Sequence, residues 1–503
     1  MKQRLLSWLV GIYQSPWAAL AIAAGCGLIA TLNHSPWRDE MNVWLIARDS
    51  PTLAALVENI HYDRAHPGLW HLIVAALHTG FGHPLAMQVF HWLLAIGSLT
   101  LFWRCSTFSQ GQKWLFTFGY LPFYEYSVIA RNYAVAMFLL FAICALWPTR
   151  RRAYWPLAGL VVLLANSNVY ALWMAIAIAL TLALEFLFEA KRPRPWLDIM
   201  GSSLLIVVGC AVSLYFILPP SDVANSALGE SFFYFDLDRL LSTVGRFFAG
   251  YYTVIPNRQR LLDVVVCTLV AIAAFVLVSL HLIKKPYALT FYLAANGLIL
   301  GFTYAKFMPR FIRHFGNFYL VLFAALWLAQ QFAESAAITR CWPRLESWSV
   351  QSRRGFRLLL TTVLVVNLVS GLYWFGLDLA VPYSAGRAAA AYIQQTDLQT
   401  TFMVGSRDAE LAPLSGHLGR RIYYPERQEL GSYTLFFKGD RQDVDQAEVL
   451  RQVSELLPTH PEILLVLTDP LAVPTPAFVI TPLEAFERSQ KEAYYLYRVR
   501  ADL

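Results

Sequence analysis

Long apolar segments separated by short polar stretches make up the first three quarters of the chain. A helix that crosses the bilayer core needs about 20 predominantly apolar residues. Eleven segments come close to that length and are predicted membrane spans: residues 16–33, 87–104, 114–126, 133–148, 154–166, 169–188, 198–218, 263–283, 287–304, 315–332 and 357–378. We therefore predict a polytopic α-helical membrane module over residues 1–378.

The pattern changes after residue 378, where short apolar runs alternate with amphipathic ones. This pattern predicts helices over 384–395, 410–418 and 444–457, and strands over 402–405, 421–424, 463–467 and 494–499. Alternating helices and strands indicate a small, partly parallel sheet. Residues 379–503 are thus expected to form a soluble α/β domain. Because it shows no Gly-rich phosphate loop, catalytic triad or metal motif, we interpret it as an accessory domain.

The composition is also that of a membrane protein. Only 15% of the 503 residues are charged and 57% are hydrophobic, whereas a soluble domain is about a quarter charged. Sixteen of the 33 acidic residues follow residue 378, which supports the division into two parts. None of the six cysteines lies in the second part, and no pair of them has the spacing of metal ligands.

Basic clusters indicate how the chain threads the membrane. They lie in short loops, as at 150–152 and 284–285, so the net charge of +7 is a topology signal and only weak evidence for nucleic acid. With eleven spans, every basic cluster is cytoplasmic if the N-terminus is inside. Residues 66–82 are interpreted as a helix at the outer interface, because a twelfth span would reverse every later loop. The outer loops 34–86 and 219–262 and the C-terminal domain then share the outer face.

An acidic pair follows the first span directly, in the run Trp37-Arg38-Asp39-Glu40. Two carboxylates at the mouth of a membrane span are costly to keep there, so they indicate a functional site facing water. Tight hairpins between later spans bring further polar and cationic side chains to the same face. The candidate substrate-binding residues on this face are Glu125, Arg131, Tyr133, Lys306, Arg310 and Arg313, together with His66 from the first outer loop.

These residue types suit glycosyl transfer from a lipid-linked sugar. A carboxylate accepts the proton of an attacking hydroxyl, which contributes about 10²–10⁴-fold to a rate. Arginines make permanently charged, bidentate contacts with phosphate oxygens. A phosphate leaving group gains negative charge as its bond breaks, and fixed cations stabilise that transition state.

The same residues resemble the motifs of GT-C-type integral membrane glycosyltransferases, a class that includes protein O-mannosyltransferases and aminoarabinose transferases. Asp39 and Glu40 match the acidic pair in the first outer loop of that class. The stretch 62–70 is similar to its "HPPLYY" motif, with Gly68 in place of Pro. The stretch 121–133 resembles "SPFLVYYSQEARPYA", with Asn132 in place of Pro, and 309–311 resembles a late "PRY" motif. The resemblance covers most of residues 10–330.

The resemblance implies an inverting glycosyltransferase of the bacterial inner membrane that uses a polyprenyl-phosphate sugar donor and faces the periplasm. It implies that Asp39, ahead of Glu40, is the catalytic base. It names neither the sugar nor the acceptor, which is a lipid, a polysaccharide or a protein of the cell envelope. Some relatives use a divalent metal; Asp39, Glu40 and Asp63 offer hard oxygen ligands, but no spacing requires a metal. The accessory domain is expected to cap the cavity or to position the acceptor.

Structural roles are the alternative for each candidate residue. Asp39 alone would serve as a helix cap, and Glu40 as the structural partner of Arg38 or Arg131. The arginines would serve as anchors for lipid headgroups, and His66 as a packing residue.

Two other functions also fit a polytopic chain. The first is a transporter or flippase of a lipid-linked sugar, which predicts inverted repeats and a polar route through the spans. The second is a membrane-anchored assembly protein whose C-terminal domain binds a partner. No internal repeat is visible, and the polar residues gather on one face only.

Overall fold

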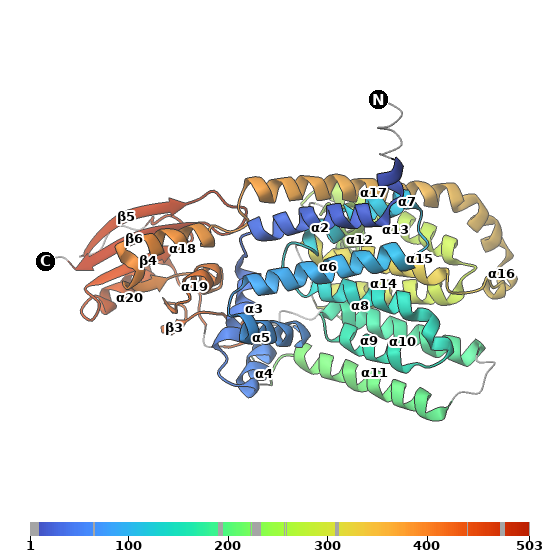
Figure 1. The fold of residues 1–503 in the computed structure, drawn as a ribbon, viewed down its shortest axis with the longest axis horizontal. Coiled ribbons are helices and arrows are strands. Elements are labelled where there is room, and N and C mark those ends of the chain that lie inside the picture. Colours follow the sequence, from blue (N-terminus) through green and yellow to red (C-terminus); the bar gives the residue numbers. More distant parts are fainter. Residues whose placement is uncertain are drawn as a thin grey trace.

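The computed structural model of the chain describes residues 10–63, 66–189, 195–221, 223, 233–255, 257, 259–306, 311–439, 441–472 and 478–501. A long helical module carries a smaller α/β domain at one end (Figure 1). The predicted fold class, a polytopic α-helical module followed by a C-terminal α/β domain, is confirmed.

Most of the module consists of long helices that run side by side. Its helices are α2 (Pro16–Asn33), α3 (Arg38–Asp49), α4 (Leu53–Tyr62), α5 (Leu69–Phe81), α6 (Leu85–Cys105), α7 (Gln110–Thr117), α8 (Tyr133–Leu146), α9 (Trp155–Ala165), α10 (Val169–Glu189), α11 (Trp196–Ile217), α12 (Leu237–Tyr252), α13 (Leu261–Leu282), α14 (Pro286–Ala305), α15 (Ile312–Ala329), α16 (Ala337–Cys341) and α17 (Pro343–Ala380). Within the described ranges, nine helices are long and apolar enough to cross a membrane, two fewer than the sequence predicts.

The two remaining predicted spans are short. Residues 154–166 contain only α9, and residues 114–126 are divided into α7 and a π-helical turn, η1 (Tyr120–Glu125). The break lies where the chain meets α17: a Cβ atom on Gly371 would sit 2.4 Å from the carbonyl oxygen of Phe118. Glycine on α17 thus permits a backbone-to-backbone approach that a side chain would prevent.

Helix α15 lies at the centre of the module. Its most apolar 18-residue window is 89% buried, compared with 17% for α11 at the periphery. A helix that is apolar all round is stable only when other helices surround it. The first turn of α15 contains Arg313, so the burial of α15 fixes the position of this cation at the end of the module that meets the C-terminal domain.

Over its described residues, the C-terminal domain is a six-stranded mixed sheet with three α-helices, α18 (Gly386–Gln395), α19 (Ala412–Leu418) and α20 (Gln446–Leu456). The strand order is β3 (Glu429–Gly431), β2 (Ile422–Tyr424), β1 (Phe402–Gly405), β4 (Glu462–Leu467), β6 (Tyr494–Ala501) and β5 (Phe478–Phe486). The central strands β2, β1 and β4 are parallel, with Val404 opposite Leu465. The predicted parallel strands are present. The sequence prediction omits β3 and β5, the two edge strands.

The C-terminal domain docks on α3. The side-chain amide of Asn42 donates to the carbonyl of Thr434 at 3.0 Å, and its oxygen accepts from the Thr434 N–H at 2.8 Å. Three residues after Thr434, the Phe437 N–H donates to the carbonyl of Tyr62, the last residue of α4, at 3.0 Å. Helix α3, which begins with the acidic pair, therefore lies between the membrane module and the domain (Figure 1).

Replacing Gly371 by Ala is expected to destabilise the protein, because the new methyl group meets backbone atoms that cannot move away cheaply. Overpacking of this kind costs about 1–3 kcal/mol. Gly376 on the same helix has nothing within 4 Å of its ideal Cβ position, so Gly376→Ala is expected to leave stability unchanged or to raise it slightly. Thermal unfolding of the two variants in detergent tests the close approach; an equal effect of both would contradict it.

Candidate active site

The site is built on the four residues that join α2 to α3. The chain turns at His34 and enters α3 at Arg38, so Asp39 and Glu40 occupy its first turn. The Glu40 carboxylate accepts the Trp37 N–H at 3.2 Å and so satisfies a free donor at the start of the helix. Glu40, and not Asp39, caps this helix with its side chain.

Glu40 belongs to a fully buried cluster. Its carboxylate contacts Nε2 of His34 at 2.9 Å and accepts the Ala130 N–H at 2.5 Å. On the other side of the imidazole, Nδ1 of His34 lies 2.9 Å from the Asp378 carboxylate at the end of α17. We call these three side chains the Glu40–His34–Asp378 cluster. The partner of Glu40 is thus His34, rather than the arginines that the sequence suggests.

The central histidine of this cluster is positively charged at neutral pH. Burial lowers the pKa of the His34 imidazole, but the neighbouring carboxylates of Glu40 and Asp378 outweigh burial and raise this pKa to about 10. An imidazolium between two carboxylates satisfies charges that would be costly to bury singly.

Asp39 points away from the cluster and is held by two arginines. Its Oδ2 lies 3.0 Å from Nη1 of Arg131 and 3.0 Å from Nη2 of Arg313. The Asp39 side chain is 22% exposed, against 9% for Arg131 and 3% for Arg313. Burial would raise the pKa of Asp39, but the guanidinium groups of Arg131 and Arg313 hold it below its usual range. Asp39 is therefore ionised at neutral pH.

Arg313 has one side-chain N–H donor that is unpaired within the described residues. Its guanidinium lies over the rings of Phe311 and Trp37, at 4.3 and 4.7 Å from their centroids, and such cation–π contacts keep it in place. Its buried Nε–H has no hydrogen-bond partner in the described part of the chain. Buried donors are nearly always satisfied, so this unpaired N–H makes Arg313 a candidate for contact with an acceptor atom of a ligand.

Histidines and tyrosines surround the two arginines. Nη2 of Arg131 lies 3.3 Å from Nε2 of His66. The Tyr133 hydroxyl lies 2.8 Å from Nδ1 of His314, which follows Arg313 on α15. The structure thus brings together five of the side chains named from the sequence: Asp39, Arg131, Arg313, His66 and Tyr133.

The other predicted site residues are placed differently. Glu125 is buried in η1 and accepts a hydrogen bond from the Tyr120 hydroxyl; in the part of the chain that the structure describes, it contacts no arginine directly but interacts electrostatically with Arg313. Lys306 is exposed at the C-terminal end of α14. Arg310 lies outside the described residues.

The three carboxylates suggested as metal ligands do not form one site. Asp39 is occupied by guanidinium groups, Glu40 by His34, and Asp63 by Nε2 of His71 at 2.9 Å. In the described part of the chain, no three His, Cys, Asp or Glu side chains lie close enough to hold a metal ion.

Sequence reasoning did not find several residues of the site. Asp378 carried a usable signal, because it is the only acidic residue in the predicted span 357–378 and a lone carboxylate in a span indicates a specific partner. His34 lies five residues before Asp39 and matches no motif, and Trp37 stands in the run that contains the acidic pair but was given no role. Lys491, which contacts Trp37 and Phe311, comes from a distant turn of the C-terminal domain that no local pattern connects to the site.

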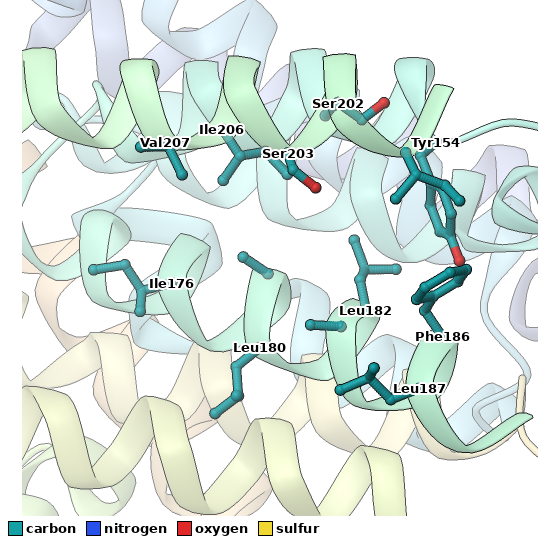
Figure 2. A pocket seen from close by; sticks show the side chains of 14 residues that line it. Tyr154, Ile176, Leu180, Leu182, Phe186, Leu187, Ser202, Ser203, Ile206 and Val207 are labelled. Atoms are coloured by element: carbon teal, nitrogen blue, oxygen red, sulfur yellow. The ribbon is translucent and has the colours of Figure 1, made fainter. Parts of the chain in front are cut away.

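A separate apolar cavity of about 490 Å³ lies between α9, α10 and α11 (Figure 2). Leucine, isoleucine, valine and phenylalanine side chains line most of it, with hydroxyl groups from Tyr154, Ser202 and Ser203. None of the residues around Asp39 belongs to its lining.

Comparison with known proteins gives matches only among solved structures. No protein-family model matches the chain, and no curated protein sequence matches it. The chain is similar to apo ArnT from Cupriavidus metallidurans, with 12% identity, a TM-score of 0.46 and 98% of each chain covered. It is also similar to two structures of the arabinofuranosyltransferase AftD from Mycobacteria, with 14% and 16% identity and TM-scores of 0.36 and 0.34. These two matches cover 96% of this chain but 41% of AftD. ArnT and AftD are GT-C glycosyltransferases, the class whose motifs the sequence resembles.

The Glu40–His34–Asp378 cluster predicts a specific dependence of stability on pH. Because the pKa of His34 is raised to about 10, its stabilising contribution is complete below its unfolded pKa of about 6.5 and is lost as the pH rises through about 10. The unfolding temperature of the wild type in detergent should therefore fall from pH 7 to pH 10. His34→Gln should be less stable at pH 7, by a few kcal/mol in order of magnitude, and should lack this part of the fall. His83→Gln, at an exposed histidine, is the control; if His34→Gln kept the slope of the control, the cluster would not be the cause.

Proposed function

We propose that this protein is an inverting glycosyltransferase that moves a sugar from a polyprenyl-phosphate donor to an acceptor. The observation that supports this most directly is the Asp39 carboxylate held between Arg131 and Arg313 where the module meets the domain. A base and two cations within one hydrogen-bonded set are what this reaction requires.

In the proposed reaction, a hydroxyl or amine of the acceptor attacks the anomeric carbon on the side opposite the phosphate. The bond from that carbon to the phosphate oxygen breaks, and its electron pair leaves with polyprenyl phosphate. The proton of the acceptor passes to Asp39. Arg131 and Arg313 stabilise the negative charge that develops on the departing phosphate.

Donor binding and base strength are coupled in this arrangement. Without donor, the two guanidinium groups stabilise the Asp39 carboxylate and make it a weak base. A donor phosphate that accepts N–H groups from Arg131 or Arg313 weakens their hold on Asp39, so the pKa of the carboxyl rises toward its ordinary value.

Glu40 has a positioning role in this proposal. Its carboxylate is fully buried and already accepts three hydrogen-bonding groups, from His34, Trp37 and Ala130. It therefore orients the first turn of α3, while Asp39 meets the substrates.

The site would face the periplasm of a bacterial cell. The basic loops of the sequence favour a cytoplasmic location for the opposite ends of the spans. The C-terminal domain docks at the same end of the module as Asp39, so domain and site share one side of the membrane.

A flippase for a lipid-linked sugar receives less support. It would need a polar route through the module. On the central helix α15, however, the polar side chains other than Tyr319 are limited to Arg313, His314 and Asn317, and residues 320–329 are all apolar.

Asp39→Asn is expected to lower kcat for sugar transfer by about 10²–10⁴-fold, because the amide cannot accept the proton of the acceptor. The assay uses the purified protein in detergent with radiolabelled polyprenyl-phosphate sugars and a membrane extract as acceptor. Asp443→Asn, at a carboxylate that is 89% exposed on the C-terminal domain, is the matched control. Near-normal turnover by a folded Asp39→Asn protein would rule out the base assignment.

Arg131→Lys is expected to raise KM for the lipid donor about tenfold or more, because lysine keeps the charge but loses the fork that bridges two acceptors. Arg451→Lys on the exposed face of α20 should change neither KM nor kcat. Steady-state kinetics with varied donor concentration measures the effect. Equal donor KM values for wild type and Arg131→Lys would argue against a phosphate-binding role for this arginine.

A further inference from the structure

The turn between β5 and β6 of the C-terminal domain reaches the membrane module. In this turn, Gln490 donates from its backbone N–H to the carbonyl of Pro382 at 3.0 Å and from its side chain to the carbonyl of Val381 at 2.9 Å. The Ala385 N–H donates to the carbonyl of Glu492 at 3.0 Å. These bonds fix residues 490–492 against the segment that follows α17.

A further bond joins this turn to the catalytic helix. The carboxylate of Glu492 accepts the N–H of Arg38 at 3.3 Å, at the first residue of α3. Lys491 is therefore held beside Asp39 by neighbours on both sides of it in the chain.

The Lys491 ammonium projects over aromatic rings of the site. Its Nζ lies 5.3 Å from the centroid of the Phe311 ring, 5.7 Å from that of Trp37 and 5.6 Å from that of Tyr383. Two of these rings, Phe311 and Trp37, also lie under the guanidinium of Arg313. Two cations from different domains thus share one aromatic platform.

Of the two cations on this platform, Arg313 is in an ion pair, and Lys491 is in none within the described residues. Within the described ranges, no carboxylate lies within ion-pair distance of Lys491, whereas Asp39 is already paired with Arg131 and Arg313. The pKa of Lys491 is lowered by partial burial and by the neighbouring charge of Arg313, against the opposing effect of Glu125 and Glu492. An anion bound beside both cations would relieve their repulsion.

We propose that Lys491 is a third cation for the donor phosphate, so that the C-terminal domain contributes directly to the binding site in the membrane module. This inference rests on the function proposed above. A lysine ammonium is a compact charge that binds phosphate without the planar geometry of arginine. Its contact gains importance during the reaction, because the phosphate leaves as a monoester with more negative charge than it had in the donor diester.

The ligand class is a phosphate ester or free phosphate, and binding experiments can separate the two. The probes are polyprenyl phosphate in detergent micelles and inorganic phosphate, each titrated against the full-length protein. Lys491→Gln removes the charge, and Lys491→Arg keeps it. Lys438→Gln is the matched control, since Lys438 is the only other lysine of the domain and is exposed.

Lys491→Gln is expected to weaken polyprenyl phosphate binding about tenfold and to raise KM for the lipid donor by a similar factor. Lys491→Arg should recover most of the affinity, and Lys438→Gln should match the wild type. A turn that serves only to hold the domain in place would instead change the unfolding temperature and leave donor KM unchanged.

Each outcome separates this inference from the proposed function. If the wild type binds polyprenyl phosphate and transfers sugar, and Lys491→Gln does both equally well, the role of Lys491 is wrong and the glycosyltransferase proposal stands. If the folded wild type binds neither probe and transfers no sugar, both proposals are wrong. Binding of inorganic phosphate that is as tight as binding of the lipid, with the same loss in Lys491→Gln, supports the cation role and assigns affinity to the phosphate group alone.

Discussion

The buried Glu40–His34–Asp378 cluster is the interaction on which the site depends. Isolated buried charges are strongly destabilising, and here the buried imidazolium of His34 is paired on both sides with a carboxyl group. The cluster joins the end of α2, the start of α3 and the end of α17, and through the Ala130 N–H it also holds the hairpin that precedes Arg131. Three parts of the chain that are far apart in the sequence, residues 34–40, Ala130 and Asp378, thus meet in one hydrogen-bonded set.

Asp39 and Glu40 are consecutive on α3, yet Glu40 is fully buried and Asp39 is partly exposed. The reason is geometric. Neighbouring residues on a helix point about 100° apart, so once Glu40 is directed inward to His34, Asp39 is directed to another side of the helix, where its side chain is 22% exposed. There it meets Arg131 from the hairpin and Arg313 from the buried α15. The chemistry assigned to Asp39 therefore rests on the packing of its neighbour.

The sequence predicted the elements of this structure better than their connections. Apolar length was sufficient for nine of the eleven predicted spans, and alternation was sufficient for the parallel strands of the domain. The break between α7 and η1, around Gly119, was not predictable. It depends on the close approach of Gly371, which lies 252 residues later on α17. The acidic pair and Arg131 were found because motifs carry them. The partner of Glu40 was not found, because it depends on which side chains are buried together, and the sequence does not show that.

The arrangement of α3 also gives the C-terminal domain a part in the proposed reaction. The same short helix contacts the domain through Asn42 and Arg38 and the module through Glu40, so movement of the domain would displace Asp39. Lys491 adds a cation to the same end of α3. It comes from the C-terminal domain, whereas Arg131 comes from the membrane module. The domain contacts the start of α3 through Glu492 and the aromatic platform through Lys491. Because water weakens every ion pair, a domain that covers this end of the module would strengthen the ion pairs of Asp39 in the proposed reaction.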